Sequence, residues 1–160
     1  SEPMAGWRVL TKLLKPGGLM RIGLYSELAR QHIVEIRKEI QSLGVGTSDA
    51  DMRKFRQSII TSANKRHKQL IKIDDFFSLS MLRDLIFHEQ EHRFTLPQIA
   101  SCLNELGLKF CGFGNKDIRT KFKAFFGNLA DVNDLMLWNE FEKNNPDHFI
   151  EMYQFWCQKL

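Results

Sequence analysis

The stretch LLKPGGLMRIGLY, residues 13–25, constrains the fold of this chain more than any other segment. Proline cannot continue a helix and glycine readily adopts turn conformations, so Pro16-Gly17-Gly18 must end any helix that precedes it. Residues 4–14 carry apolar side chains at helical spacing, which predicts such a helix. Residues 19–25 are few and mostly apolar, which is typical of a buried strand. The segment therefore predicts a helix, a tight turn and a strand.

A series of helices is expected after this strand. Ser26 is predicted to cap a helix that runs to about Gly44, because apolar residues recur three and four positions apart along it. Thr47 or Ser48 is expected to cap the next helix, whose first turn carries acidic residues that suit the positive end of the helix dipole. A third helix is expected over about 79–91.

Thr95-Leu96-Pro97-Gln98 has the form of a capping box, in which a threonine and a glutamine three positions later bond the free amides of a helix start. With proline in the first turn, the pattern predicts a helix from 96 to 106 that closes at Gly107. The remaining expected elements are strands at 108–113 and 149–158 and helices at 117–126 and 132–143. The chain is therefore predicted to be α/β, with about three strands and many helices.

The motif His88-Glu89-Gln90-Glu91-His92 matches H-E-x-x-H, the signature of zinc peptidases. Zinc needs both imidazoles on one face of a continuous helix, together with a third ligand. The cap at Thr95 begins a new helix soon after the motif, and no third ligand follows at the usual spacing. We therefore predict no metal site here.

Three cysteines, Cys102, Cys111 and Cys157, stand far apart and never as C-x-x-C. An odd and scattered set argues for reduced thiols, so a cytoplasmic location is expected. No apolar run approaches the roughly 20 residues of a membrane span. The first ten residues also lack the basic start and apolar core of a signal peptide.

Positive charge is concentrated in the first half of the chain. Up to Lys72 there are 14 Lys and Arg against six Asp and Glu, and from Ile73 onward there are nine against 13. Such a basic half could meet an anionic partner, or could simply be a solvated surface. A nucleic-acid-binding helical module is one alternative function, and its phosphate contacts would come from Arg53, Lys54, Arg56, Lys65, Arg66 and Lys68.

Several segments resemble those of class I S-adenosylmethionine-dependent methyltransferases. LLKPGGLMRIGLY resembles the segment that leads into their fifth strand, LGLKFCGF the sixth strand, and FIEMYQFWCQ the closing antiparallel strand. AGWRVLTKLLKPGGLMRIGLYSELAR, with FHEQEHRFTLPQI and MYQFWCQ, is similar to a group of these enzymes often joined to tetratricopeptide repeats. The resemblance spans almost the whole chain and implies S-adenosylmethionine as cofactor.

The glycine-rich loop with which such enzymes approach the cofactor has no counterpart in this sequence, which contains no G-x-G-x-G. The resemblance therefore implies the C-terminal half of a Rossmann-like methyltransferase sheet, with the cofactor-binding residues expected upstream of Ser1. Residues 1–160 would be a single incomplete domain. Its parts would be 1–25 with the first strand, a helical insertion or cap at 26–107, and closing strands and helices at 108–160.

Two sets of residues are candidates for the substrate side. Tyr25 and Glu27 end the first strand, where open α/β sheets bind ligands, although both could equally serve the local structure. His88, Glu91 and His92 lie in the insertion and could act as bases or orienting donors, or as structural groups. The methyl acceptor itself is not predicted.

The chain alone is expected to be inactive, since half of the fold would be missing. The strand at 19–25 would then have a bare edge, which predicts self-association or a partly rearranged sheet. The alternative is a binding or interaction module without catalysis.

Overall fold

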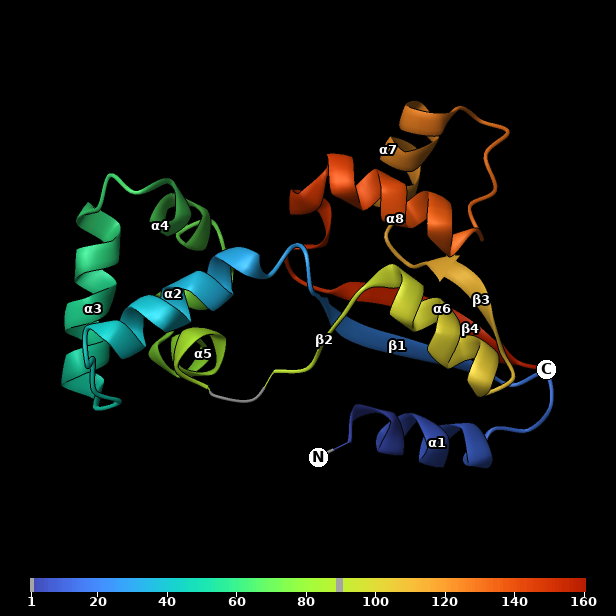
Figure 1. Ribbon diagram of the computed structural model, residues 1–160, viewed down its shortest axis with the longest axis horizontal. Coiled ribbons are helices and arrows are strands. Elements are labelled where there is room, and N and C mark those ends of the chain that lie inside the picture. The colour runs from blue at the N-terminus through green and yellow to red at the C-terminus, as the bar shows by residue number, and fades with distance from the viewer. Residues whose placement is uncertain (1, 89–90) are drawn as a thin grey trace. The chain divides into compact units, whose positions relative to one another are not determined.

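The computed structural model describes residues 2–88 and 91–160. The chain forms two compact units, one of residues Ser1–Ala29 and His92–Leu160 and the other of Arg30–Glu91 (Figure 1). We call them the sheet unit and the helical unit. The architecture is mixed α/β, as the sequence predicted.

The sheet unit begins with helix α1 (Pro3–Leu13), a turn, and strand β1 (Leu19–Ser26), so the prediction from the Pro-Gly-Gly segment is confirmed. Gly17 has a φ of 76°, a conformation that costs glycine little. Its amide donates to the carbonyl of Lys159 at 2.8 Å, which ties the turn to the last strand.

Four strands form the sheet, in the order β2-β1-β4-β3. Besides β1 they are β2 (Arg93–Phe94), β3 (Leu108–Phe113) and β4 (Tyr153–Lys159). Strand β4 is antiparallel to both β1 and β3, so β1 and β3 run in the same direction. The prediction for β3 is confirmed, whereas the final strand begins at Tyr153 and not at 149. Pro146–Phe149 instead forms a 3₁₀ turn, η3, because proline after the last helix starts a new turn.

One edge of the sheet is largely open. Strand β2 pairs with β1 only at Tyr25 and Ser26. Within the described residues, 19–24 have a strand partner on the β4 side alone. Open edges of this kind are templates for a further strand.

Helices cover one face of the sheet more fully than the other. Helices α6 (Leu96–Glu105), α7 (Lys116–Phe126) and α8 (Leu135–Asn144) belong to this unit and were predicted within three residues. Their aromatic side chains pack against the sheet, as where the Trp138 ring of α8 lies 4.8 Å from that of Phe113 on β3 between centroids. On the opposite face Leu19 and Trp156 are 57% and 41% exposed.

The helical unit consists of short helices around its own apolar core. Its elements are α2 (Gln31–Ser42), α3 (Asp49–Thr61), α4 (Lys65–Leu70), the 3₁₀ turn η1 (Asp74–Phe77), α5 (Leu79–Leu82) and the π-helical turn η2 (Arg83–Phe87). Isoleucines of α2 and α3 meet aliphatic and aromatic side chains of the later turns in this core. No helix among the described residues could span a membrane.

Two predictions about helix ends in this region were wrong. Ser26 does not cap α2, whose N-cap is Arg30; Ser26 is a buried residue at the end of β1. Ser48, in contrast, caps α3 as predicted and accepts a hydrogen bond from the amide of Asp51. The helix expected over 79–91 ends at Phe87, and His88 is already extended at φ −77° and ψ 130°. Glu89 and Gln90 lie outside the described residues.

Candidate functional site

The carboxyl ends of β1 and β3 and the start of β4 lie at the same end of the sheet, since β1 and β3 are parallel and β4 runs oppositely. We call this end the carboxyl edge, as distinct from the open lateral edge along β1. Ligands of open α/β sheets bind at this kind of edge. Tyr25 and Glu27 lie there, both half-buried, and Glu27 Oε2 is 3.0 Å from Nε of Arg93 on β2. The structure therefore places Tyr25 and Glu27 at this end of the sheet. It also places the Arg93 guanidinium beside Glu27, which the sequence did not suggest.

A buried polar network lies at the carboxyl edge of the sheet. The hydroxyls of Ser26 and Tyr153 donate to the two carboxyl oxygens of Glu142 at 2.5 and 2.6 Å, and the amide of Ala29 donates to Ser26 Oγ at 2.9 Å. Burial raises the pKa of Glu142, and the hydrogen bonds from the two hydroxyls oppose that rise. Burial and the neighbouring Glu142 raise the pKa of the Tyr153 phenol. The network anchors α8 to β1 and β4.

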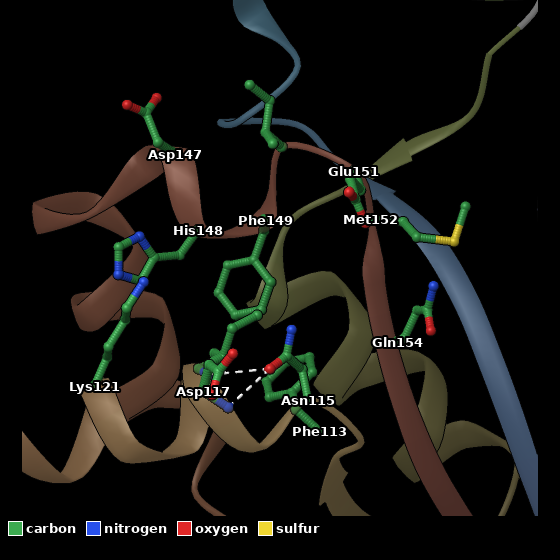
Figure 2. A pocket seen from close by; sticks show the side chains of 12 residues that line it. Phe113, Asn115, Asp117, Lys121, Asp147, His148, Phe149, Glu151, Met152 and Gln154 are labelled. Atoms are coloured by element: carbon green, nitrogen blue, oxygen red, sulfur yellow. Dashed lines mark hydrogen bonds between the residues drawn. The ribbon is translucent and has the colours of Figure 1, made fainter. Parts of the chain in front are cut away.

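A cavity of about 310 Å³ opens where β3 ends and β4 begins (Figure 2). One face of α7, the turn η3 and the chain that enters β4 form its walls. Its lining residues are Phe113, Asn115, Asp117, Ile118, Lys121, Asp147, His148, Phe149, Ile150, Glu151, Met152 and Gln154. The carboxylates of Asp117, Asp147 and Glu151 are exposed around it, whereas Phe113 and Phe149 beneath them are almost fully buried.

His148 stands at one end of this cavity. Figure 2 shows His148 and Lys121 pointing toward one another from η3 and α7. Burial is the main cause that lowers the pKa of His148, the Lys121 ammonium lowers it further, and Asp147 raises it. The pKa of His148 is therefore below the ordinary histidine value, which favours the neutral imidazole.

The predicted histidines are both exposed. His88 belongs to the helical unit and His92 to the sheet unit, and His88 has left the helix before the motif ends. The two imidazoles thus do not share the continuous helix that a zinc peptidase requires. Among residues 2–88 and 91–160, no three His, Cys, Asp or Glu side chains gather as a metal site would need.

Glu91 has strong partners within the helical unit. Its carboxylate lies 2.7 Å from Nη2 of Arg30 and 3.1 Å from Nη2 of Arg37, and the side chains of Glu91 and Arg30 are only 5% and 4% exposed. Arg37 also donates to the carbonyl of Leu85 at 2.8 Å. This arrangement ties the end of the helical unit to α2, which gives Glu91 a clear structural role.

Sequence reasoning did not identify Glu142, Tyr153 or the residues of the cavity. One signal was present for Glu142, which lies four positions after Trp138 and seven after Leu135 and so falls on the apolar stripe of its helix. A carboxylate at an inward position predicts buried polar partners. The cavity had no such signal, because its walls come from segments that only the sheet brings together.

Comparison with known proteins gave similarity of fold but not of sequence. No family model and no curated protein matches the chain. Solved structures do match, among them PKMT2 from Rickettsia typhi, a protein lysine methyltransferase, at a TM-score of 0.55, and the same protein in complex with AdoHcy, at 0.57. Each is 14% identical to this chain, and each alignment covers 94% of it but 30% of PKMT2. The chain therefore has a methyltransferase-like fold and spans under a third of the length of these structures.

Proposed function

We propose that this chain is the C-terminal part of an S-adenosylmethionine-dependent methyltransferase and supplies its substrate side. The observation that carries the proposal is the sheet, in which antiparallel β4 lies between the parallel strands β1 and β3 and the edge of β1 stays open. The similarity to PKMT2 over 94% of the chain supports it. So does the cavity at the carboxyl edge, where substrates of open sheets bind.

The residues of this chain do not fit the cofactor. Gly112 and Gly114 follow β3, but the amide of Gly114 donates to the carbonyl of Gln154 at 2.9 Å, and Asn115 Oδ1 already accepts from the first amides of α7. This leaves no glycine-rich loop open for a nucleotide at this strand end. We therefore propose that S-adenosylmethionine binds a segment upstream of Ser1, and that this chain alone is inactive.

The polypeptide described here would form the substrate side of the enzyme and hold the methyl acceptor in line with the methyl group, since methyl transfer depends mostly on alignment. Tyr25 and Glu27 are proposed to contact the acceptor. His88, Glu91 and His92 remain proposed as bases or orienting donors. Which nucleophile is methylated stays open.

The open edge of β1 is proposed to pair with the preceding strand of the complete sheet. In the isolated chain the same edge would pair with a second copy, because unpaired backbone groups at an edge seek partners. Light scattering is expected to report a dimer or larger species for the isolated chain. A monodisperse monomer in which all amides of 19–24 exchange slowly would contradict this pairing.

Two observations test the proposal for the complete protein. The gene segment before Ser1 is expected to encode a strand followed by a glycine-rich loop, whereas an unrelated domain there would contradict the proposal. Hydrogen exchange at β1 amides that point away from β4 is expected to be slow in the complete protein. Fast exchange at those amides would show that no strand pairs there.

A non-catalytic module with a basic helical face is the second candidate. Arg53 and Lys54 on α3 and Lys65 and Lys68 on α4 are exposed, which favours a polyanion partner. Two members of the predicted basic set have local partners, since Arg56 donates to the carbonyl of Phe77 and Arg66 pairs with Glu35. Binding to RNA that falls steeply with salt, without any cofactor binding by the complete protein, would favour this candidate.

A cytoplasmic location is proposed from the cysteines. Cys102, Cys111 and Cys157 are free thiols, and burial raises the pKa of Cys157 to about 11. A buried thiol of that kind is inert, and free thiols are typical of a reducing compartment.

A further inference from the structure

Three buried side chains at the carboxyl edge of the sheet contact one another in a triangle of oxygens. Ser26 ends β1, Glu142 lies on α8, and Tyr153 begins β4. The Ser26 and Tyr153 hydroxyls lie 2.5 and 2.6 Å from the two oxygens of Glu142, and they lie 3.1 Å from each other. Ser26 and Tyr153 are fully buried, and Glu142 is 3% exposed. Every side of the triangle is therefore short enough for a hydrogen bond and closed to water.

The number of protons limits how many of these contacts are hydrogen bonds. A serine or tyrosine hydroxyl carries one proton, and an ionised carboxylate carries none. When Glu142 is ionised, both hydroxyl protons point to its oxygens, so the contact between Tyr153 and Ser26 contains no proton. When Glu142 is protonated, three protons serve three contacts, and the triangle closes into a ring. Each of the three side chains then donates one hydrogen bond to its neighbour in the ring and accepts one from the other.

The surroundings of the triangle suit the protonated form. Ser26 Oγ also accepts from the Ala29 amide at 2.9 Å, and a hydroxyl oxygen has two lone pairs, so this bond and the closed ring are compatible. Among residues 2–88 and 91–160, Glu142 forms no ion pair with a Lys, Arg or His. Burial without a cation raises the pKa of Glu142, and the two hydroxyls oppose that rise. Burial and Glu142 raise the pKa of Tyr153, so the phenol keeps its proton.

Other titratable groups lie on the elements packed around the triangle. They are Glu27 after β1, Arg93 on β2, Glu105 on α6, Lys121 on α7, Glu140 and Lys143 on α8, and Asp147 and His148 on η3. Of these, Glu27 acts on the phenol of Tyr153 and raises its pKa. The causes that shift the pKa of Glu142 are its burial and the two hydroxyls. The proton on Glu142 is therefore governed mainly by the triangle itself.

Ser26 connects the triangle to the candidate site. It stands between Tyr25 and Glu27, and we call these three residues the strand end. The strand end is also held by β2, because Ser26 pairs with Phe94 and the Glu27 amide donates to the Phe94 carbonyl at 2.9 Å. A bond gained or lost between Tyr153 and Ser26 thus acts on the backbone that carries Tyr25 and Glu27.

We propose that Glu142 is a positioning residue whose protonation sets the conformation of the strand end. At low pH the closed ring holds Ser26 through both Tyr153 and Glu142. At high pH the contact between Tyr153 and Ser26 opens, because two oxygens that face each other without a proton gain no hydrogen bond and repel. The strand end is then less constrained. This inference rests on the proposed function in one respect, that the strand end faces the methyl acceptor.

An NMR titration of the ¹³C,¹⁵N-labelled chain from pH 4 to pH 8 tests the proposal. It follows the carboxyl carbons of Glu142 and Glu27, the phenol carbon of Tyr153, and the amides of Tyr25 and Glu27. The midpoint of Glu142 is expected above the ordinary value of about 4.3 for glutamic acid. The phenol carbon and both amides are expected to show a transition at that same midpoint, distinct from the titration of the Glu27 carboxyl. A midpoint of Glu142 at or below the ordinary value, or amides that do not follow it, would overturn the proposal.

Matched variants assign the transition. Glu142→Gln keeps a donor and an acceptor at the same place but cannot ionise, and it is expected to remove the transition shared by Tyr153 and the amides of the strand end. Glu140→Gln makes the same change at an exposed position of α8 and is expected to leave the transition in place. His148→Gln removes an imidazole that titrates within the same pH range and is also expected to leave it. A transition that persists in Glu142→Gln, or that is lost in either control, would contradict the role of Glu142.

The titration requires neither cofactor nor methyl acceptor. Its failure would therefore leave the proposed methyltransferase standing. Failure of the complete protein to bind the cofactor would, in turn, leave the dependence of the strand end on Glu142 standing.

Discussion

Tyr153→Phe tests whether the buried network at the sheet edge holds the sheet unit together. The Tyr153 hydroxyl is fully buried and donates to Glu142 at 2.6 Å, and it lies 3.1 Å from Ser26 Oγ. Phenylalanine keeps the ring, whose centroid is 4.9 Å from that of Phe149, and removes only the oxygen. The substitution thus isolates the hydrogen bonds from the aromatic packing.

The expected loss follows from the partner of this hydroxyl. A hydrogen bond to a charged group contributes about 1.5–3 kcal/mol to stability. Removing the Tyr153 hydroxyl leaves the buried Glu142 carboxyl group without this bond, and water cannot replace it. We therefore expect the free energy of unfolding to fall by about 1.5–3 kcal/mol at neutral pH. Tyr25→Phe, the same change at a half-buried tyrosine, is expected to cost less than Tyr153→Phe, because water can replace part of what a half-buried hydroxyl loses.

The loss should depend on pH because of Glu142. Burial raises the pKa of Glu142 in the folded state, so its favourable contribution is complete below the unfolded value and is lost as pH rises through the folded value. The Tyr153 hydroxyl lowers that pKa, and its removal must raise it further. The destabilisation by Tyr153→Phe should therefore be larger at pH 8 than at pH 4, and Glu142→Gln should remove the difference.

Urea unfolding followed by tryptophan fluorescence measures all three variants, since Trp138 is buried in the same unit. A loss below about 0.5 kcal/mol at pH 7 would mean that the hydroxyl contributes little. Equal losses at pH 4 and pH 8 would refute the argument about the carboxyl group.

Three further predictions concern the segment around the H-E-x-x-H motif. Thr95→Ala removes one half of the capping box with Gln98 and is expected to cost about 1 kcal/mol in urea unfolding; no change would mean that the box does not stabilise α6. Glu91→Gln leaves two arginines of the helical unit without their carboxylate, and a loss of about 3–5 kcal/mol is expected from the helical signal in circular dichroism. A loss below 1 kcal/mol would contradict the structural role of Glu91. Purified protein is expected to lack stoichiometric zinc by atomic emission, and one zinc per chain that His88→Ala removes would restore the peptidase hypothesis.

Local chemistry explains which parts of the fold could be predicted. Pro16-Gly17-Gly18, the cap at Ser48 and the capping box at Thr95 act through neighbours within four residues, so the sequence carries their whole cause. Strand β3 is equally local, because its short apolar run lies between the end of α6 and the cap of α7. These elements formed as expected.

The elements that were missed depend on distant partners. Strand β2 has two residues and exists only because Arg93 and Phe94 pair with the end of β1, far away in sequence. Periodicity did not reveal the end of η2 at Phe87, because His88 and His92 continue the helical spacing past the point where the backbone leaves the helix. The start of β4 was placed too early since aromatic residues favour strands, while Pro146 favours a turn.

The candidate site follows the same division. The position of Tyr25 and Glu27 at the end of β1 could be predicted because a strand end is visible in the sequence, and their role on a substrate stays a prediction. The cavity around His148 could not, because η3 and α7 meet only after β3 and β4 have paired. The roles of His88, Glu91 and His92 on the substrate remain predictions.

Calorimetric titration with S-adenosylmethionine tests the central claim most directly, that this chain is the substrate-side part of a larger methyltransferase. The 160-residue chain is expected to give no binding heat, and the protein encoded by the complete gene is expected to bind with a dissociation constant in the micromolar range. Micromolar binding by the chain alone would contradict the assignment of the cofactor site to the upstream segment. Absence of binding by the complete protein would contradict the methyltransferase itself.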